Sequence, residues 1–341
     1  MRLLTCFTTF ALVGLLAAAP TADDDDKLVI NKEFYFKDFI KYKAEHDIVQ
    51  LLVPINSLNF DEDDSSSSSE SNEVDTDIII FFVEADVQPD GSYIDKGLYV
   101  LKEGKAKKLL ENGREAAASG DSSRKVFFAA KDGLYVYNPA TNSAEKYGTI
   151  TDSIVGIAKE KEGDVIYILT EGREVYKVSD NGEKKELLED VVKAKKIVLD
   201  YESNLYFYSD DNVPYVRTGD GVKKIEGLPE VSGKVTLVKP PFFFEDGVPF
   251  VTGNQLYVIY SNGTSELTPI EFQSDTLPTA YAPEAGLIQY YAYDKKIYEY
   301  NILALLLGTV IEELGEFLNQ KSTDINTIAS KHESLKRKIK S

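Results

Sequence analysis

One short pattern recurs six times along the 341-residue chain and constrains its fold more than any other feature. In each occurrence an apolar run is followed by a turn and then by a second run with a tyrosine near its centre. The tyrosines, separated by 36, 41, 39, 42 and 41 residues, are Tyr99, Tyr135, Tyr176, Tyr215, Tyr257 and Tyr298. A period of about 40 residues, with every unit reading as β-strands, is typical of a β-propeller. The sequence therefore predicts an all-β fold, a six-bladed propeller.

Each repeat divides into four expected strands, of which the first lines the central channel and the fourth faces solvent. The second is the apolar run, the third holds the repeated tyrosine, and the fourth is rich in charged residues, as suits an exposed sheet edge. The expected first strands are 51–53, 115–118, 155–158, 197–200, 235–238 and 279–281. The sixth repeat has no fourth strand of its own, so we expect 28–30 to complete it. The propeller is predicted over 47–302.

The first 46 residues precede the repeats. Residues 1–22 resemble a secretory signal peptide, because Arg2 precedes an apolar run that ends in small residues. The only cysteine, Cys6, lies within this segment, so the processed chain would have no thiol for a disulfide or a metal site. Residues 23–46 read as an acidic terminus followed by an arm, either a short helix or an extended segment, that packs on the propeller. We expect a secreted, extracellular protein.

Three features bear on modification and assembly. The sequon at Asn262 predicts N-glycosylation in an exposed turn. Residues 61–76 are acidic and serine-rich, which predicts a disordered insert in blade 1. Within it, Ser68 and Ser71 each have an acid two positions later, a pattern that favours phosphorylation by secretory-pathway kinases. Residues 303–341 have apolar residues at helical spacing and a basic end, which predicts an amphipathic α-helical tail for self-association or partner docking.

The charge of the chain limits its partners. The formal net charge is −19, which disfavours nucleic acid and anionic membranes as partners because their phosphates are repelled. The only histidines, His46 and His332, lie outside the repeats, which argues against a Ser-His-Asp triad. These observations favour a small-molecule ligand and a protein that is not an enzyme.

The strand motifs of the propeller resemble those of the ommochrome-binding proteins of moth haemolymph. The resemblance is carried by residues 131–138 (KDGLYVYN) and by 165–168, 175–178, 197–200 and 204–207. It implies a secreted propeller that binds a kynurenine-derived pigment without catalysis and without a required cofactor. The serine-rich insert and the helical tail depart from the pattern of that family.

Tyrosine is suited to such a ligand, because its ring stacks on planar molecules and its hydroxyl forms hydrogen bonds. The candidate ligand-binding residues near the channel or its rim are Tyr93, Tyr215, Tyr281, Tyr290 and Tyr291. The six repeated tyrosines, in contrast, read as blade-packing residues, because a site should lie where the blades differ. The longest connection between a second and a third strand, 84–96 in blade 1, is therefore the expected location.

Two alternatives remain open from the sequence. A calcium-dependent, lactonase-like hydrolase would need oxygen ligands near the channel, since calcium prefers carboxylates and amides. The candidate calcium ligands are Glu115, Asp152, Asp200, Glu230 and Asp275. The other alternative is an extracellular structural or matrix protein whose phosphorylated insert binds calcium.

Overall fold

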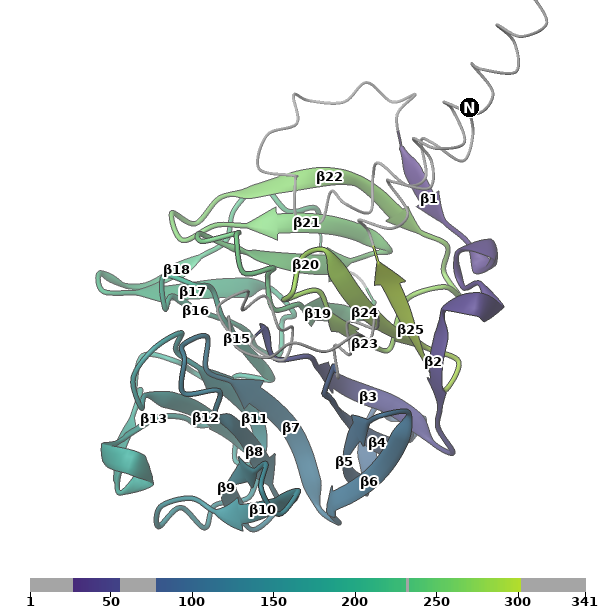
Figure 1. The fold of residues 1–341 in the computed structure, drawn as a ribbon. Helices are drawn as coiled ribbons and strands as arrows, with labels where there is room; N and C mark the ends of the chain where they lie inside the picture. Colours follow the sequence, from purple (N-terminus) through teal and green to yellow (C-terminus); the bar gives the residue numbers. More distant parts are fainter. Residues whose placement is uncertain (1–26, 56–77, 231–232, 302–341) are drawn as a thin grey trace, which may run out of the picture.

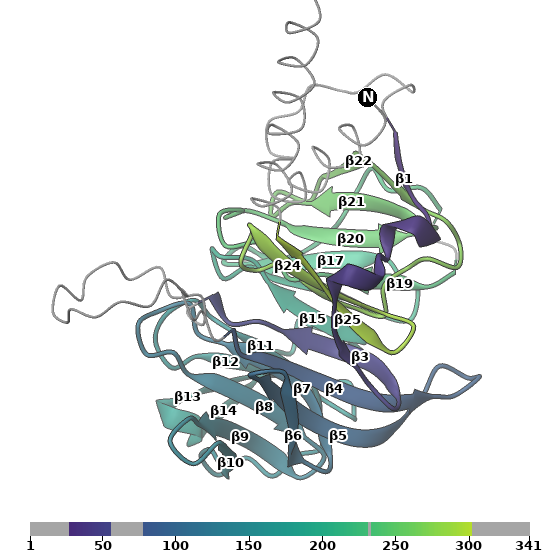
Figure 2. The ribbon, with the colours of Figure 1, turned by 45° about the vertical axis from the view of Figure 1, so that its right-hand side comes forward.

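The computed structural model describes residues 27–55, 78–230 and 233–301. Six sheets stand around a central channel, which confirms the prediction of an all-β, six-bladed propeller (Figures 1 and 2). The predicted signal peptide, the insert with Ser68 and Ser71, and the predicted helical tail at 303–341 lie outside the described residues.

Four blades are formed by consecutive antiparallel strands. Blade 1 comprises β3 (Asp47–Leu52), β4 (Ile80–Val87), β5 (Tyr93–Lys102) and β6 (Lys105–Leu110). Blade 2 comprises β7 (Gly113–Ala118), β8 (Val126–Ala130), β9 (Gly133–Asn138) and β10 (Ser143–Lys146). Blade 3 comprises β11 (Ile154–Lys159), β12 (Ile166–Thr170), β13 (Val175–Ser179) and β14 (Lys184–Leu187). Blade 4 comprises β15 (Lys196–Leu199), β16 (Leu205–Tyr208), β17 (Pro214–Thr218) and β18 (Gly221–Lys224).

The last two blades each include a strand from the N-terminal arm. Blade 5 comprises β19 (Val235–Leu237), β20 (Val248–Thr252), β21 (Gln255–Ile259), β22 (Ser265–Phe272) and β1 (Leu28–Ile30), which runs parallel to β22. Blade 6 comprises β23 (Ala280–Ala282), β24 (Ile288–Tyr293), β25 (Lys296–Asn301) and β2 (Ile40–Lys43), which is antiparallel to β25. The ring is thus closed by β2, and the expectation that 28–30 would complete blade 6 is wrong.

Aromatic packing explains this arrangement of the arm. Two 3₁₀ turns, Lys32–Phe34 and Lys37–Phe39, separate β1 from β2. The ring of Phe34 stacks on Tyr300 at 4.5 Å between centroids, and the ring of Tyr35 stacks on Tyr293 at 3.9 Å. The hydroxyl of Tyr35 also donates to the carbonyl of Thr276 at 2.6 Å. These contacts hold the arm against blade 6, so the segment after them pairs with β25. The predicted packing arm is correct, but it contains 3₁₀ turns and a strand.

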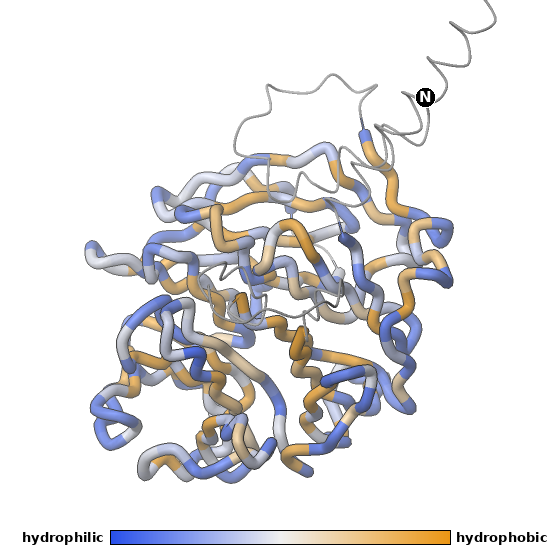
Figure 3. The backbone as a smooth tube through the Cα atoms, viewed as in Figure 1, coloured by the Kyte–Doolittle hydropathy of each residue, from blue (hydrophilic) through white to orange (hydrophobic). Residues whose placement is uncertain are grey.

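Burial follows the position of each strand in its blade. The second strands β8, β12 and β20 are buried along their whole length, because each blade has a neighbouring blade on both faces. The fourth strand β14 is exposed along its whole length. Figure 3 shows the same gradient, with hydrophobic residues on the inner strands and hydrophilic residues at the turns and outer edges.

The repeated tyrosines pack within the blades. Tyr99 stacks on Phe82 at 5.2 Å, and Tyr215 stacks on Phe207 at 5.4 Å in the equivalent place of blade 4. In blade 3 the ammonium of Lys185, on the fourth strand, lies 4.0 Å from the ring centroid of Tyr176, so the charged outer strand covers the tyrosine strand. The repeated tyrosines therefore have the structural role that their regular spacing indicates.

Candidate functional site

A cavity of about 290 Å³ occupies the central channel. All six first strands contribute to its wall, with apolar residues such as Leu51, Ala117 and Val198. We call the end of the channel at which the first strands begin the proximal end, and the end at which they finish the distal end. Polar and aromatic side chains line both ends, so the channel is the part of the described chain at which ligand chemistry concentrates.

Two tyrosines line the cavity toward the proximal end. Tyr93 is the first residue of β5, and its side chain is about half exposed at 54%. Tyr208 is the last residue of β16, and burial raises its pKa to about 12. Tyr93 was among the sequence candidates, whereas Tyr208 was missed. Its position at the end of a second strand, the same end at which Tyr93 lies, is the signal that could have identified it.

Tyr93 lies on a long hairpin that is anchored to two neighbouring blades. The expected loop at 84–96 is mostly strand, because β4 and β5 continue past the neighbouring blades and leave only a turn at 88–92 (Figure 2). Arg114 of blade 2 donates to the carboxylate of Asp95 at 2.9 Å and to the hydroxyl of Ser153 of blade 3 at 3.0 Å. Both partners of the Arg114–Asp95 ion pair are largely buried, so the pair fixes the base of the hairpin.

An ion pair connects blades 2 and 4, the two neighbours of blade 3. The carboxylate of Glu115, only 7% exposed, accepts from the backbone N–H of Ile157 at 2.9 Å and pairs with the ammonium of Lys196. Because Glu115, Ile157 and Lys196 belong to three successive blades, this carboxylate ties their first strands together. Each of its two oxygens therefore has a partner on another blade, which is the behaviour of a structural group.

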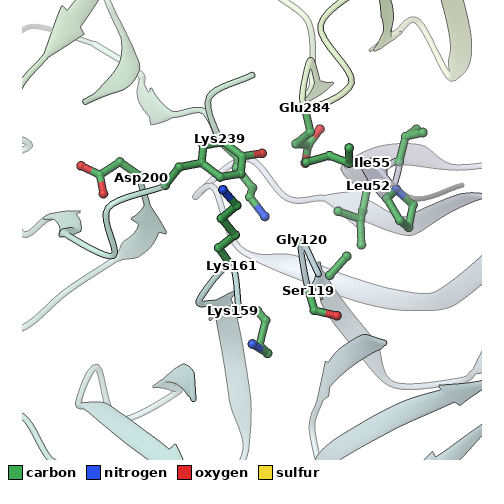
Figure 4. A pocket seen from close by; sticks show the side chains of 13 residues that line it. Leu52, Ile55, Ser119, Gly120, Lys159, Lys161, Asp200, Lys239 and Glu284 are labelled. Carbon is green, nitrogen blue, oxygen red and sulfur yellow. The ribbon is translucent and has the colours of Figure 1, made fainter. Parts of the chain in front are cut away.

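The distal end carries a second, narrow pocket with buried polar groups. Lys239, Glu284 and Tyr201 line it, and Lys239 and Glu284 also border the large cavity. One carboxylate oxygen of Glu284, a residue only 3% exposed, has no hydrogen-bond partner among the described residues, and neither does the buried hydroxyl of Tyr201. Figure 4 shows Lys161 and Lys239 reaching into this space, while Asp200 turns away from it.

Burial governs the ionisation of this distal cluster. Burial raises the pKa of Glu284 to about 7, although the positive charge of Lys239 opposes the shift. Burial also lowers the pKa of Lys239, and the negative charge of Glu284 opposes that shift. The two groups are close enough to influence each other, but the described residues include no ion pair between them. The distal cluster therefore holds two groups that are costly to keep charged.

Replacing Glu284 by glutamine is expected to remove a pH-dependent contribution to stability. A carboxyl group with a pKa of 4.5 when unfolded and about 7 when folded stabilises the protein fully below pH 4.5, and this contribution disappears as the pH rises through 7. The wild type should thus lose up to about 3 kcal/mol relative to Glu284→Gln between pH 4 and pH 8. Urea denaturation of both proteins at several pH values measures the difference, and parallel stability curves would contradict the buried-acid interpretation.

The structure brings only part of the predicted tyrosine set to the channel. Tyr93 and Tyr281 line the main cavity, and Tyr281 lies edge-on to Tyr291 at 6.0 Å between centroids. Tyr291 is buried beside a small apolar cavity of about 30 Å³ between blades 5 and 6. Tyr290 is buried and donates to Glu299 at 2.6 Å, which is a structural contact. Tyr215 lies outside the channel, where its hydroxyl donates to Asp211 at 2.9 Å.

The five carboxylates of the calcium hypothesis lie in separate environments. Asp152 pairs with Lys185, and Asp275 pairs with Lys32, each at 2.6 Å. The buried carboxylate of Asp200 accepts hydrogen bonds from Asn204, Tyr206 and Gly247, among others. Glu230 is exposed next to the undescribed residues 231–232, and Glu115 pairs with Lys196 as described above. Within the described ranges, no three His, Cys, Asp or Glu side chains are grouped so that they could hold a metal ion.

The predicted glycosylation site lies in the turn between β21 and β22. Asn262 is exposed, and its side-chain oxygen accepts hydrogen bonds from the backbone and the hydroxyl of Thr264 at 2.9 and 2.7 Å. In the part of the chain that the structure describes, no helix is long and apolar enough to cross a membrane.

Comparisons with known proteins add little to these observations. No family model and no curated protein matches the chain. Among solved structures, PorZ, a surface component of the type-IX secretion system of Porphyromonas gingivalis, is 12% identical with a TM-score of 0.46, over 76% of this chain and 37% of PorZ. A Bacteroides thetaiotaomicron protein of unknown function is 12% identical with a TM-score of 0.47, over 76% and 70% of the two chains. A chain of a mitotic checkpoint complex is 10% identical with a TM-score of 0.46, over 65% and 86%.

This chain therefore spans little more than a third of PorZ. At identities this low the likeness concerns the fold alone, and a function must be argued from the residues of the channel.

Proposed function

We propose that this protein is a secreted propeller that binds a small planar aromatic ligand, of the kynurenine-derived ommochrome type, in its central channel. The observation that carries the proposal is the cavity of about 290 Å³ with three tyrosines, Tyr93, Tyr208 and Tyr281, in a wall that combines aliphatic side chains with lysines and other polar groups. Ligand pockets in proteins combine apolar and aromatic side chains with placed polar groups, and this volume lies just below their usual range of about 300 to 1,000 Å³.

The three tyrosines come from different blades, which suits a flat ligand. Tyr93 belongs to blade 1, Tyr208 to blade 4 and Tyr281 to blade 6, so their rings approach the cavity from different sides of the channel. Aromatic rings favour offset-stacked or edge-on contacts with other rings, and their hydroxyl groups can meet the polar edge of the ligand. Secretion is supported by the character of residues 1–22 and by the exposed position of Asn262.

Replacing Tyr208 by alanine is expected to weaken binding of an aromatic probe about 2- to 10-fold, which is the effect of losing one aromatic contact. Tyr215→Ala is the matched control, because Tyr215 lies on the adjacent strand of the same blade but outside the channel. Titration of the purified protein with an ommochrome pigment, followed by absorbance, measures both variants. A wild type that binds no pigment would refute the proposal, as would equal losses in both variants.

A further inference from the structure

The lining of the channel differs in charge from the rest of the chain. The chain as a whole has a formal charge of −19, yet the large cavity is lined by five lysines and only two glutamates. The lysines are Lys159, Lys195, Lys196, Lys234 and Lys239. Positive side chains in a cavity with low-dielectric walls attract negative ligand groups more strongly than they would in water. The channel is therefore a local positive region within an acidic protein.

Most of these lysines already have partners. Lys196 pairs with Glu115, and Lys195 lies 3.5 Å from Asp210. The ammonium of Lys159 donates to the backbone carbonyls of Glu160 and Glu162 at 2.7 and 3.3 Å. Among the described residues, Lys234 and Lys239 form neither an ion pair nor a hydrogen bond through their ammonium groups. Lys234 is exposed at the proximal end, whereas Lys239 lies in the channel at the distal end.

Lys239 is surrounded by other groups with unused hydrogen-bonding capacity. Its ammonium lies 6.0 Å from the ring centroid of Tyr201, whose buried hydroxyl has no partner among the described residues. Glu284, one oxygen of which has no partner within the described part of the chain, lines the same pocket. Buried polar groups are nearly always satisfied in native proteins, so several such groups around one pocket mark a place where a polar ligand group can be bound.

The narrow pocket at the distal end, which forms the floor of the channel, is by itself too small for an organic molecule. Its volume is about 10 Å³, which is the room that a single water molecule or one polar atom group needs. It shares Leu52, Lys159, Lys239 and Glu284 with the large cavity above it. A ligand body in the large cavity could thus place one polar group against these residues.

We propose that the distal floor of the channel binds the anionic group of the ligand, a carboxylate or a phosphate, with Lys239 as the pairing charge and the Tyr201 hydroxyl as a hydrogen-bond donor. The inference rests on the proposed function for the aromatic part of the ligand and adds its acid group. At pH 6 the carboxyl group of Glu284, with a pKa of about 7, carries a proton and donates as well. The carboxylate of Asp200 is occupied by its own loop and points away from the pocket (Figure 4).

The test compares two aromatic probes of the same shape, kynurenate and its primary amide, by calorimetric titration at pH 6. We expect kynurenate to bind about 10- to 100-fold more tightly than the amide, because a hydrogen bond to a charged group is lost in the amide. In Lys239→Gln this preference should disappear. Lys234→Gln is the matched control, because Lys234 also forms no ion pair with the residues that the structure describes, but it precedes β19 whereas Lys239 follows it. This variant should keep the preference.

The other outcomes separate the two proposals. Equal binding of both probes to the wild type would overturn the anion site and leave the aromatic site standing. Loss of the preference in Lys234→Gln but not in Lys239→Gln would also overturn the distal anion site, because the carboxylate of the probe would then bind at the proximal end. If neither probe binds, the aromatic proposal fails, and inorganic phosphate then decides: a rise in the thermal midpoint at constant ionic strength for the wild type but not for Lys239→Gln supports the anion site, and no rise overturns it.

Discussion

A chain that begins at Ala44 is expected to lose the cooperative unfolding transition of the intact propeller. This truncation removes β1, both 3₁₀ turns and β2, and it leaves β25 as an unpaired edge in blade 6. Three residues of β25 are buried: Ile297, Tyr298 and Tyr300. Residues of the removed segment pack against them and exclude part of the solvent. Exposed strand edges with apolar neighbours favour intermolecular pairing, so we expect aggregation as well as instability.

The size of the effect follows from the aromatic side chains that are lost. Phe34, Tyr35, Phe39 and Tyr42 pack against the clusters of blades 5, 6 and 1. Complete burial of one large apolar side chain contributes about 1.5 to 3 kcal/mol. Tyr35 is buried and the other three are partly buried, so together they amount to roughly 4 to 7 kcal/mol. Single domains have free energies of unfolding of about 5 to 15 kcal/mol, so this loss removes much or all of the stability of the propeller.

Two longer chains separate the contributions of β1 and β2. A chain that begins at Lys27 retains every described contact and should unfold like the full chain. A chain that begins at Asn31 lacks only β1, whose three residues pair with the outer strand of blade 5, and should keep a cooperative transition with a lower midpoint. Thermal and urea denaturation followed by circular dichroism compare the three. If the chain from Ala44 unfolds as cooperatively as the chain from Lys27, β2 does not hold the ring closed.

The architecture could be predicted from the sequence because blade packing imposes a repeated local pattern. Each second strand must be apolar on both faces, and the run 126–130 is recognisable for that reason. The expected first strand at 115–118 matches β7, which begins two residues earlier. These features depend only on the position of a residue within its own repeat, so a single sequence reveals them.

The closing strand and the site depend on contacts between distant residues, which no local pattern reveals. Segments 28–30 and 40–43 are both short and partly apolar, and the stacking of Phe34 and Tyr35 on blade 6 decides which of them closes the ring. Tyr206 and Tyr208 lie on the same face of one strand, yet only Tyr208 reaches the channel cavity, because it is at the strand end. Lys239 and Glu284 come to line the same pocket only after the ring has formed.

Replacing Gly133 by alanine is expected to cost about 3 to 5 kcal/mol. Gly133 begins the tyrosine strand β9 with a φ of +132°, a backbone conformation that side chains with a Cβ rarely adopt. A Cβ atom at this position would lie 2.2 Å from the carbonyl oxygen of Ile150, a backbone atom that cannot rotate away. An unfavourable φ costs roughly 1 to 3 kcal/mol, and overpacking adds a similar amount.

Two further glycines separate these two costs. Gly163 has a φ of +73° but open space around its Cβ position, so Gly163→Ala should cost only about 1 to 2 kcal/mol for the backbone conformation. Gly219 has neither a positive φ nor a close neighbour, so Gly219→Ala should change the stability by less than about 1 kcal/mol and can be stabilising. Urea denaturation of the three variants at one pH gives the ranking.

The same constraint recurs at Gly97, where φ is +127° and a Cβ would lie 2.9 Å from the carbonyl oxygen of Leu110. If Gly133→Ala proves no worse than Gly163→Ala, the close approach of Ile150 is not a real constraint, and the glycine before the repeated tyrosine would be explained by its φ angle alone.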